Sequence, residues 1–417
     1  MVKILNLLNQ DSATKRLAEL DKVAKTLEFP ERDPRYINNH IHTIYSFSPY
    51  SPTAAVYASA KAGLCTAGII DHDSISGARE FLHAANILDL PVTCGFELRV
   101  SWQDSPFSDQ RINNPDQNGV AYMTMQGVAA KYFSEVENFL IPLREKRNQR
   151  NKEMIDALNQ RLSSEMQLDF ESDVLPLSEA HDGGSVTERH LMYAFAKKIT
   201  EKLGKGEPTI KFLEQQGVEL SENNKEMLLD INYEYYEYDV LGILKASFVP
   251  QIYIDATDEL CSIDQFVELG KKINAVACYA YLGDVTDSVT GDKAAQAFED
   301  SYLDELFNFL DKKDINAVTY MPARNTPEQV ARLKKLCVEH NKFQISGEDI
   351  NSPRQDFICY AMENPEFSNL IDSTWALIAH ERESQKDADE TFFADSIIKR
   401  FPKVEDRVAY FKSLIRD

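Results

Sequence analysis

The stretch Asn39-His40-Ile41-His42-Thr43, followed about thirty residues later by Ile70-Asp71-His72-Asp73, contains the strongest signal in this chain. Successive side chains of a strand point to opposite faces, so His40 and His42 share a face. Imidazoles beside carboxylates suit a divalent cation such as zinc, manganese or iron. Three of only 8 histidines in 417 residues fall in this window, so chance clustering is a weak explanation. The pattern favours a metal-centred enzyme over a purely structural role.

Composition narrows the range of partners. The chain is 43% hydrophobic and 27% charged, as is usual for a globular enzyme, and its formal net charge is −22. This charge argues against stable binding to nucleic acid or to an anionic membrane, since both are held by clustered Lys and Arg. A small phosphorylated substrate stays possible, because a bound cation can invert the local potential.

The cysteines and apolar segments suggest a compartment. None of the six cysteines forms a C-x-x-C pair, which argues against a thiolate zinc site, and scattered thiols are typical of reduced cytoplasmic proteins. The apolar run at the N-terminus is too short for a signal peptide, and no segment approaches 18 apolar residues. We therefore expect a cytoplasmic protein without a membrane span, and nothing in the sequence indicates an oligomeric state.

The first hundred residues alternate between strand and helix patterns. After a helix at 11–28, we expect strands at 36–43, 67–70 and 91–100, separated by helices at 53–62 and 76–88. The histidines and acidic residues then fall at or near strand ends. This order favours a parallel sheet or barrel, in which the loops at the carboxyl ends of strands carry the chemistry.

The pattern changes beyond residue 103. A polar loop at 104–119 precedes a long charged helix at 131–168, and helical patterns continue to about 245. The basic run from Arg144 to Arg150 is interpreted mainly as a solvated helix face, with a substrate-binding arginine as the alternative. Strands are then expected at 249–254, 273–279, 315–320 and 343–346, alternating with helices at 261–272, 293–312 and 326–341.

Four short motifs occur in a specific order: His40-Ile41-His42-Thr43, Asp71-His72-Asp73, Gly95-Phe96-Glu97 and Gly347-Glu348-Asp349-Ile350-Asn351. A further segment, Thr187-Glu188-Arg189-His190, opens a helix after the helical region. Together they resemble the PHP (polymerase and histidinol phosphatase) superfamily, in particular the longer bacterial PHP-type phosphoesterases. The resemblance covers residues 36–100 closely and 180–360 loosely.

The resemblance implies an α/β fold, a distorted seven-unit (β/α) barrel of PHP type with an all-helical insertion. The expected organisation is an N-terminal helical extension (1–35), the first part of the barrel (36–102), a loop and helical insertion (103–245), the second part of the barrel (246–365) and an acidic helical C-terminal tail (366–417).

The resemblance also implies metal ligands. His40, His42, Glu97 and Asp349 match one complete site, while His72 and His190 match ligands of neighbouring sites. The chain departs from the family pattern in three places. Phe47 stands where an Asp or His is usual, only Cys278 or Tyr279 is available where a His is usual, and Asn351 replaces a final His as a weaker ligand. We therefore expect one to three divalent ions, of which one is well held.

The leading hypothesis is a metal-dependent phosphoesterase that hydrolyses a small phosphorylated metabolite or nucleotide with metal-activated water. Asp71 and Asp73 are expected to orient the imidazoles. Arg324 and Arg354, with Arg189 as a third candidate, are expected to neutralise the phosphoryl oxygens. Two alternatives stay open: a degraded PHP barrel that binds a ligand or partner, and a single-metal amidohydrolase-like hydrolase.

Overall fold

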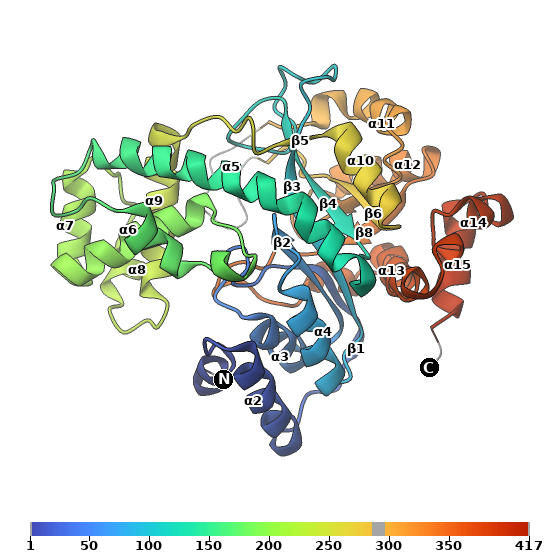
Figure 1. The fold of residues 1–417 in the computed structure, drawn as a ribbon, viewed down its shortest axis with the longest axis horizontal. Helices are drawn as coiled ribbons and strands as arrows, with labels where there is room; N and C mark the ends of the chain where they lie inside the picture. The colour runs from blue at the N-terminus through green and yellow to red at the C-terminus, as the bar shows by residue number, and fades with distance from the viewer. Residues whose placement is uncertain (1, 286–296, 416–417) are drawn as a thin grey trace.

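An eight-stranded sheet organises the chain in the computed structural model, which describes residues 2–285 and 297–415 (Figure 1). The strands are β1 (Asp33–Ile41), β2 (Leu64–His72), β3 (Val92–Ser101), β4 (Val120–Gln126), β5 (Cys261–Ser262), β6 (Val276–Ala280), β7 (Ala317–Tyr320) and β8 (Phe343–Ser346). They follow the order β1-β2-β3-β4-β6-β7-β8, and the short β5 pairs with β3. Only β4, among these strands, runs antiparallel to its neighbours.

The sheet curves until its two ends meet. The backbone N–H of His42 donates to the carbonyl of Ile350 at 2.9 Å, and the N–H of Ile350 donates to the carbonyl of His40 at 3.1 Å. The segment that follows β8 is thereby joined to β1 and nearly closes a barrel. The distorted α/β barrel expected from the sequence is confirmed, and its closure brings the ends of the first and last strands to one rim.

The barrel is flanked by α1 (Val2–Leu8), α2 (Ala13–Thr26), α3 (Pro52–Ala62), α4 (Ala78–Ile87), α10 (Ile263–Lys272), α11 (Leu303–Lys312) and α12 (Pro327–Glu339). Local sequence sets their ends. At the start of α3, the Ser51 side chain accepts a hydrogen bond from Ala54 N and Pro52 occupies the first turn, while Gly63 ends the helix with a φ of 83°. Among residues 2–285 and 297–415, no helix has both the length and the apolar character needed to cross a bilayer.

The helical insertion forms a separate layer with α5 (Phe133–Asn159), α6 (Glu188–Leu203), α7 (Glu207–Gln215), α8 (Glu222–Leu229) and α9 (Tyr236–Ile252). These helices lie to one side of the barrel, and the long α5 reaches across to it (Figure 1). They enclose a hydrophobic core of their own, which includes Leu158, Phe195 and Leu244.

Two of the differences from the sequence prediction concern strands of the barrel. Residues 103–245, expected to be an all-helical insertion, contain β4, which pairs within the barrel sheet. The strand predicted at 249–254 is wrong, because α9 continues through Phe248 and Val249, which are buried in the insertion core. A short apolar run fits a buried strand and a buried helix equally well. The first residues of the helix predicted at 293–312 lie outside the described residues.

The C-terminal segment forms α13 (Ser368–Lys386), α14 (Asp395–Arg400) and α15 (Val404–Ser413). It is helical, as expected, but α13 covers part of the sheet instead of extending away from it. Ala376 and Leu377 of α13 share a buried apolar cluster with Val276 of β6 and Phe343 of β8.

Candidate metal centre

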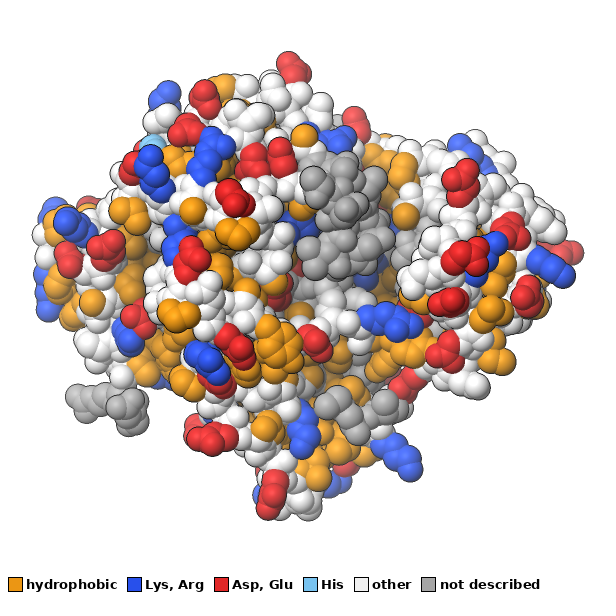
Figure 2. Space-filling view, turned by 180° about the vertical axis from the view of Figure 1, so that it is seen from behind, with side chains coloured by type: hydrophobic (Ala, Val, Ile, Leu, Met, Phe, Trp, Pro, Cys, Tyr) orange, Lys and Arg blue, Asp and Glu red, His pale blue; other side chains and the backbone are white. Residues whose placement is uncertain are grey.

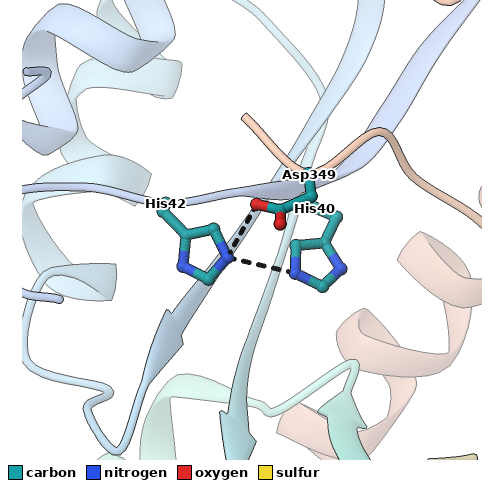
Figure 3. Close-up of side chains that lie close together, drawn as sticks. All are labelled: His40, His42 and Asp349. Atoms are coloured by element: carbon teal, nitrogen blue, oxygen red, sulfur yellow. Dashed lines mark hydrogen bonds and ion pairs between the residues drawn. The ribbon is translucent and has the colours of Figure 1, made fainter. Parts of the chain in front are cut away.

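The rim where the barrel closes gathers His40, His42 and Asp349 (Figure 3). His40 and His42 lie at the end of β1, and Asp349 lies in the segment that follows β8. The Nε2 atoms of the two histidines are 3.2 Å apart, and His42 Nε2 lies 3.2 Å from Asp349 Oδ1. His42 is 1% exposed, whereas 40% of the Asp349 side chain is exposed.

A second group shares His42 and adds His72 and Glu97. His72 ends β2 and is in register with Glu97 of β3, so the two side chains meet across the strand pair. His72 Nδ1 lies 2.9 Å from Glu97 Oε2, and His40 Nε2 lies 3.9 Å from the same oxygen. Within each three-residue group, the candidate ligand atoms all lie within 4.8 Å of one another.

The donor set fits a divalent cation. Ligands about 2.0–2.2 Å from one tetrahedral ion lie about 3.3–3.6 Å from each other, close to the 3.2 Å contacts around His42 Nε2. Imidazole nitrogens and carboxylate oxygens are ligands that zinc, manganese and iron accept. Five such side chains on one rim therefore supply two overlapping sets of donors.

The charges of these groups depend on one another. Burial lowers the pKa of His40, which favours the neutral form that can ligate a metal. Burial also opposes protonation of His42, but the adjoining Asp349 carboxylate outweighs it and raises the pKa of His42. Burial would raise the pKa of Glu97, yet the neighbouring His72 holds it below its ordinary value. His42 likewise holds the pKa of Asp349 low against the effect of burial.

Asp71 supports the site without entering either group. Its carboxylate accepts hydrogen bonds from Thr43 N at 2.7 Å and from Ser46 Oγ at 2.7 Å. Ser46 Oγ in turn lies 3.2 Å from His42 Nδ1. Asp71 therefore orients the His42 ring through Ser46, a link that the sequence motif did not indicate because serine carries no metal-binding signal.

Backbone packing also positions His40. The side chain of Asn38 accepts from the N–H of His40 at 2.9 Å and donates to the carbonyl of Glu348 at 3.0 Å. Asn39 donates to the carbonyl of Ser346 at 2.8 Å. Gly347 lies so close to His40 that a Cβ on it would be 2.6 Å from His40 Cβ. Sequence reasoning missed these asparagines, whose role is visible only once β1 and β8 are adjacent.

Asp73 has a different role from the one predicted. Its backbone has a φ of 52°, its N–H donates to the carbonyl of Glu97 at 2.9 Å, and its carboxylate pairs with Arg147. It therefore contacts no imidazole through a described hydrogen bond. Instead it joins the end of β2 to helix α5.

The Arg147–Asp73 pair belongs to a buried ionic network between the insertion and the barrel. Arg147 and Arg150 of α5 are each 5% exposed, so the solvated helix face predicted for this basic run is wrong for these arginines, although Lys146 does face solvent. Glu188, at the start of α6, contacts Arg99 at 3.2 Å, Arg147 at 2.9 Å and Arg150 at 2.5 Å. The network fixes the beginning of α6 against β3.

His190 and Phe47 lie together beside the rim. The Nδ1 atom of His190 accepts from Thr187 N at 3.0 Å in a helix-capping arrangement, and burial lowers the pKa of His190 to about 3. Its ring packs against Phe47 at 4.8 Å between centroids. The structure places His190 in neither three-residue group. Phe47 occupies this region with an apolar ring where the family pattern has a ligand.

The structure also shows the surroundings of Asn351, Cys278 and Tyr279, the other departures from the family pattern. Asn351 reaches the rim, where its Nδ2 donates to Asp349 Oδ1 at 2.7 Å, so it supports the carboxylate. Its role as a metal ligand stays a prediction. Cys278 is fully buried in a cluster with α13, and the hydroxyl of Tyr279 donates to Glu299 at 3.0 Å. Neither residue takes the place of the missing histidine in the two groups.

A pocket of about 180 Å³ opens beside His40, His72, Glu97 and Asp349. Among the described residues that line it, the positively charged side chains besides histidine are Arg189 of α6 and Lys245 of α9. Its wall also includes Asn113, Tyr122 and Tyr281. The insertion therefore supplies the basic side chains of a pocket that is also lined by candidate metal ligands.

The two arginines predicted to face the substrate lie elsewhere. Arg354 makes a two-point contact with Asp239 of α9, at 2.8 Å and 2.7 Å, and stacks on Tyr233. Arg324 donates to the carbonyl of Leu282 at 3.1 Å. Neither is among the described residues that line the pocket, so their contact with a substrate stays a prediction. The third candidate, Arg189, is there.

Solved structures of other proteins agree with this architecture, whereas no family model and no curated protein matches the sequence. A solved structure from Bifidobacterium adolescentis, provisionally described as a metal-dependent phosphoesterase, has a TM-score of 0.51 and 17% identity, over 82% of this chain and 98% of that one. An amidohydrolase from Chromobacterium violaceum, with bound sulfate and no metal, has a TM-score of 0.51 and 14% identity, over 78% of this chain and 90% of that one.

The likeness is one of fold. It agrees with the distorted barrel that the resemblance to the PHP superfamily implies. It extends over 98% and 90% of the two solved structures and over 82% and 78% of this chain. At 17% and 14% identity, the likeness does not extend to the chemistry of this chain.

Proposed function

We propose that this protein is a metal-dependent hydrolase that cleaves a small phosphate ester. The observation that carries the proposal is the convergence of three histidines and two carboxylates on one barrel rim, facing a pocket with two basic side chains. Metal-binding residues and cations around one small cavity suit a substrate whose reacting group is a compact anion.

His40, His42 and Asp349 would hold one divalent cation, with Glu97 and His72 beside it. A bound cation of this kind lowers the pKa of water and polarises a phosphoryl oxygen. The protein's own contribution is to orient the ligands. Asp71 fixes His42 through Ser46, and Asn351 steadies the Asp349 carboxylate. Such supporting groups tune both the metal affinity and the ligand geometry.

The basic side chains of the pocket would bind the substrate. Arg189 and Lys245 offset the negative charge of a phosphoryl group, which the acidic chain would otherwise repel. Burial raises the pKa of Tyr122, so its hydroxyl keeps its proton near neutral pH and can donate to a substrate oxygen. A guanidinium can hold two phosphoryl oxygens at once, which an ammonium group does less well.

The size and surface of the site support a small substrate. The pocket is about 180 Å³. On the face drawn in Figure 2, the Lys and Arg side chains of the described residues are scattered among Asp and Glu rather than gathered into a stripe. A nucleic acid is usually held by such a stripe, because each phosphate requires a nearby cation.

A single-metal hydrolase of a C–N or C–O bond is the second candidate. The specific observation in its favour is that Phe47, Cys278 and Tyr279 leave fewer ligands than a site with several metals requires. Such a site suits the amidohydrolase-like reading as well as it suits a phosphoesterase. The two candidates differ in whether the anion-binding wall contributes to turnover.

The test compares substrates of different charge. Protein loaded in turn with zinc, manganese and iron is assayed for kcat/KM on aryl phosphate monoesters and diesters, a neutral aryl ester and an aryl amide. We expect hydrolysis of a phosphate ester well above that of the neutral substrates. Hydrolysis of the amide or neutral ester alone would favour the second candidate. No turnover of any substrate would favour a binding protein built on the same barrel.

A further inference from the structure

Phe47 is a barrel residue that belongs to the core of the insertion. It lies in the loop after β1, is 5% exposed and packs among the insertion residues His190, Tyr193 and Tyr238. The ring centroids of Phe47 and Tyr238 are 5.4 Å apart. Phe47 therefore connects the metal-bearing rim with the helices that carry the basic side chains of the pocket.

The Phe47 ring also contacts Arg189. The guanidinium carbon of Arg189 lies 5.1 Å from the centre of the Phe47 ring, within the range of a cation–π contact. Its Nη2 atom lies 3.5 Å from the carbonyl oxygen of Asn351, so the guanidinium borders the metal-bearing rim. Arg189 also lines the pocket together with Glu97 and Asp349.

The residues on either side of Arg189 are held firmly. Glu188 is clamped by Arg99, Arg147 and Arg150, and His190 completes the helix cap with Thr187. The first turn of α6 therefore has a defined position relative to the barrel. The ring of Phe47 is one of the groups that the long Arg189 side chain contacts, so it helps to set the direction of that side chain.

We propose that Phe47 is a positioning residue, whose ring holds the Arg189 guanidinium at the pocket so that it binds the oxyanion of the substrate. The inference deepens the proposed function, because it assigns recognition of the phosphoryl group to one side chain of the insertion. Phe47 cannot ligate a metal, and it contributes instead to the binding of the substrate anion through Arg189.

The test is a double-mutant cycle on phosphate affinity. Binding of inorganic phosphate to the metal-loaded protein is measured by calorimetry for the parent, Phe47→Leu, Arg189→Ala and the double variant. Arg189→Ala is expected to weaken phosphate binding about ten- to a hundredfold, the worth of a charge-assisted hydrogen bond. Phe47→Leu, which keeps an apolar side chain but removes the ring, is expected to weaken it about two- to fivefold.

The cycle separates positioning from general packing. If Phe47 acts through Arg189, Phe47→Leu has no further effect once Arg189 is alanine. Phe170→Leu is the matched control, since Phe170 is also 5% exposed, lies in the same core and carries Lys152 over its ring. It should leave phosphate affinity unchanged. Arg189→Lys keeps the charge without the planar fork and should retain only part of the affinity.

Several results would overturn the inference. Among them are an equal effect of Phe47→Leu in both backgrounds, an equal effect of Phe170→Leu, or unchanged phosphate binding in Arg189→Ala and Arg189→Lys. If Phe47→Leu fails to fold, Phe47→Met, which also keeps an apolar side chain without the ring, takes its place in the cycle. A parent that binds phosphate through Arg189 but hydrolyses no phosphate ester would uphold this inference and refute the proposed function. A parent that binds no phosphate would overturn the inference itself.

Discussion

Replacing Gly347 with alanine should damage the metal centre through one added methyl group. An ideal Cβ at this position would lie 2.6 Å from His40 Cβ and 2.9 Å from His40 N. Non-bonded carbon atoms pack at about 3.5–4.0 Å, so the two segments must separate by about 1 Å. The clash involves the backbone of β1, which cannot move aside as a flexible side chain can. The displaced residue is itself a candidate ligand.

The expected size of the effect follows from this geometry. Overpacking of a close contact costs about 1–3 kcal/mol of folding free energy. Misplacing a metal ligand or its support typically weakens metal binding about ten- to a hundredfold. Gly347→Ala should therefore show both a lower unfolding temperature and a raised Kd for zinc or manganese, measured by thermal denaturation and calorimetry.

Gly242→Ala is the matched control. Gly242 lies within α9, and a Cβ added there meets nothing within 4 Å. Because alanine is favoured over glycine within a helix by about 0.5–1 kcal/mol, this variant should be slightly more stable and bind metal normally. If Gly347→Ala kept the parent's metal affinity and unfolding temperature, the close packing of Gly347 against His40 could not be what positions the ligand.

Two further predictions concern buried charges. Glu259→Gln removes one of the two carboxylates that pair with Arg99 and Arg150, so that Glu188 alone faces both guanidinium groups. It should cost about 3–5 kcal/mol of unfolding free energy in chemical denaturation, whereas Asp258→Asn at the exposed neighbour should change it little. Equal effects of the two variants would contradict the buried network. Burial raises the pKa of Glu381 to about 7. The protonated side chain therefore contributes to the free energy of unfolding, fully so below the pKa of the unfolded state, and this contribution to stability is lost as the pH rises through 7. Glu381→Gln should therefore raise the unfolding temperature relative to the parent at pH 8 but not at pH 4, and the same difference at both values would contradict this assignment.

Local patterns predicted the barrel and much of the rim. His40 and His42 follow from the two-residue period of a strand, and His72 and Glu97 lie in register on adjacent parallel strands. Asp349 was found from its motif, and the closing hydrogen bonds between Ile350 and β1 explain why it arrives beside His42. These residues could be predicted because each lies at or near the end of a recognisable element.

Contacts between distant segments could not be predicted in this way. Arg147 pairs with Asp73, 74 residues away, and Arg354 pairs with Asp239, 115 residues away. A sequence shows that such arginines are charged, but not which carboxylate will meet them after folding. For the same reason the buried network was mistaken for a solvated face, and Arg354 was expected at the substrate.

The apolar segments were ambiguous for a different reason. Phe248, Val249 and Ile252 of α9 are buried by the insertion rather than by the sheet, and both environments select the same kinds of side chain. β4 follows a polar loop and runs against its neighbours, so the alternation of helix and strand expected for a parallel barrel did not reveal it.

We propose that His40 and His42 hold a divalent cation together with the adjacent carboxylates. Elemental analysis of the full-length protein, purified without chelator, tests it most directly when the parent is compared with the double variant His40→Ala, His42→Ala. We expect about one zinc, manganese or iron ion per parent chain and none in the folded double variant, because both three-residue groups of candidate ligands contain His42. Equal metal content in both proteins, or no metal in the parent even after incubation with each cation, would contradict the account.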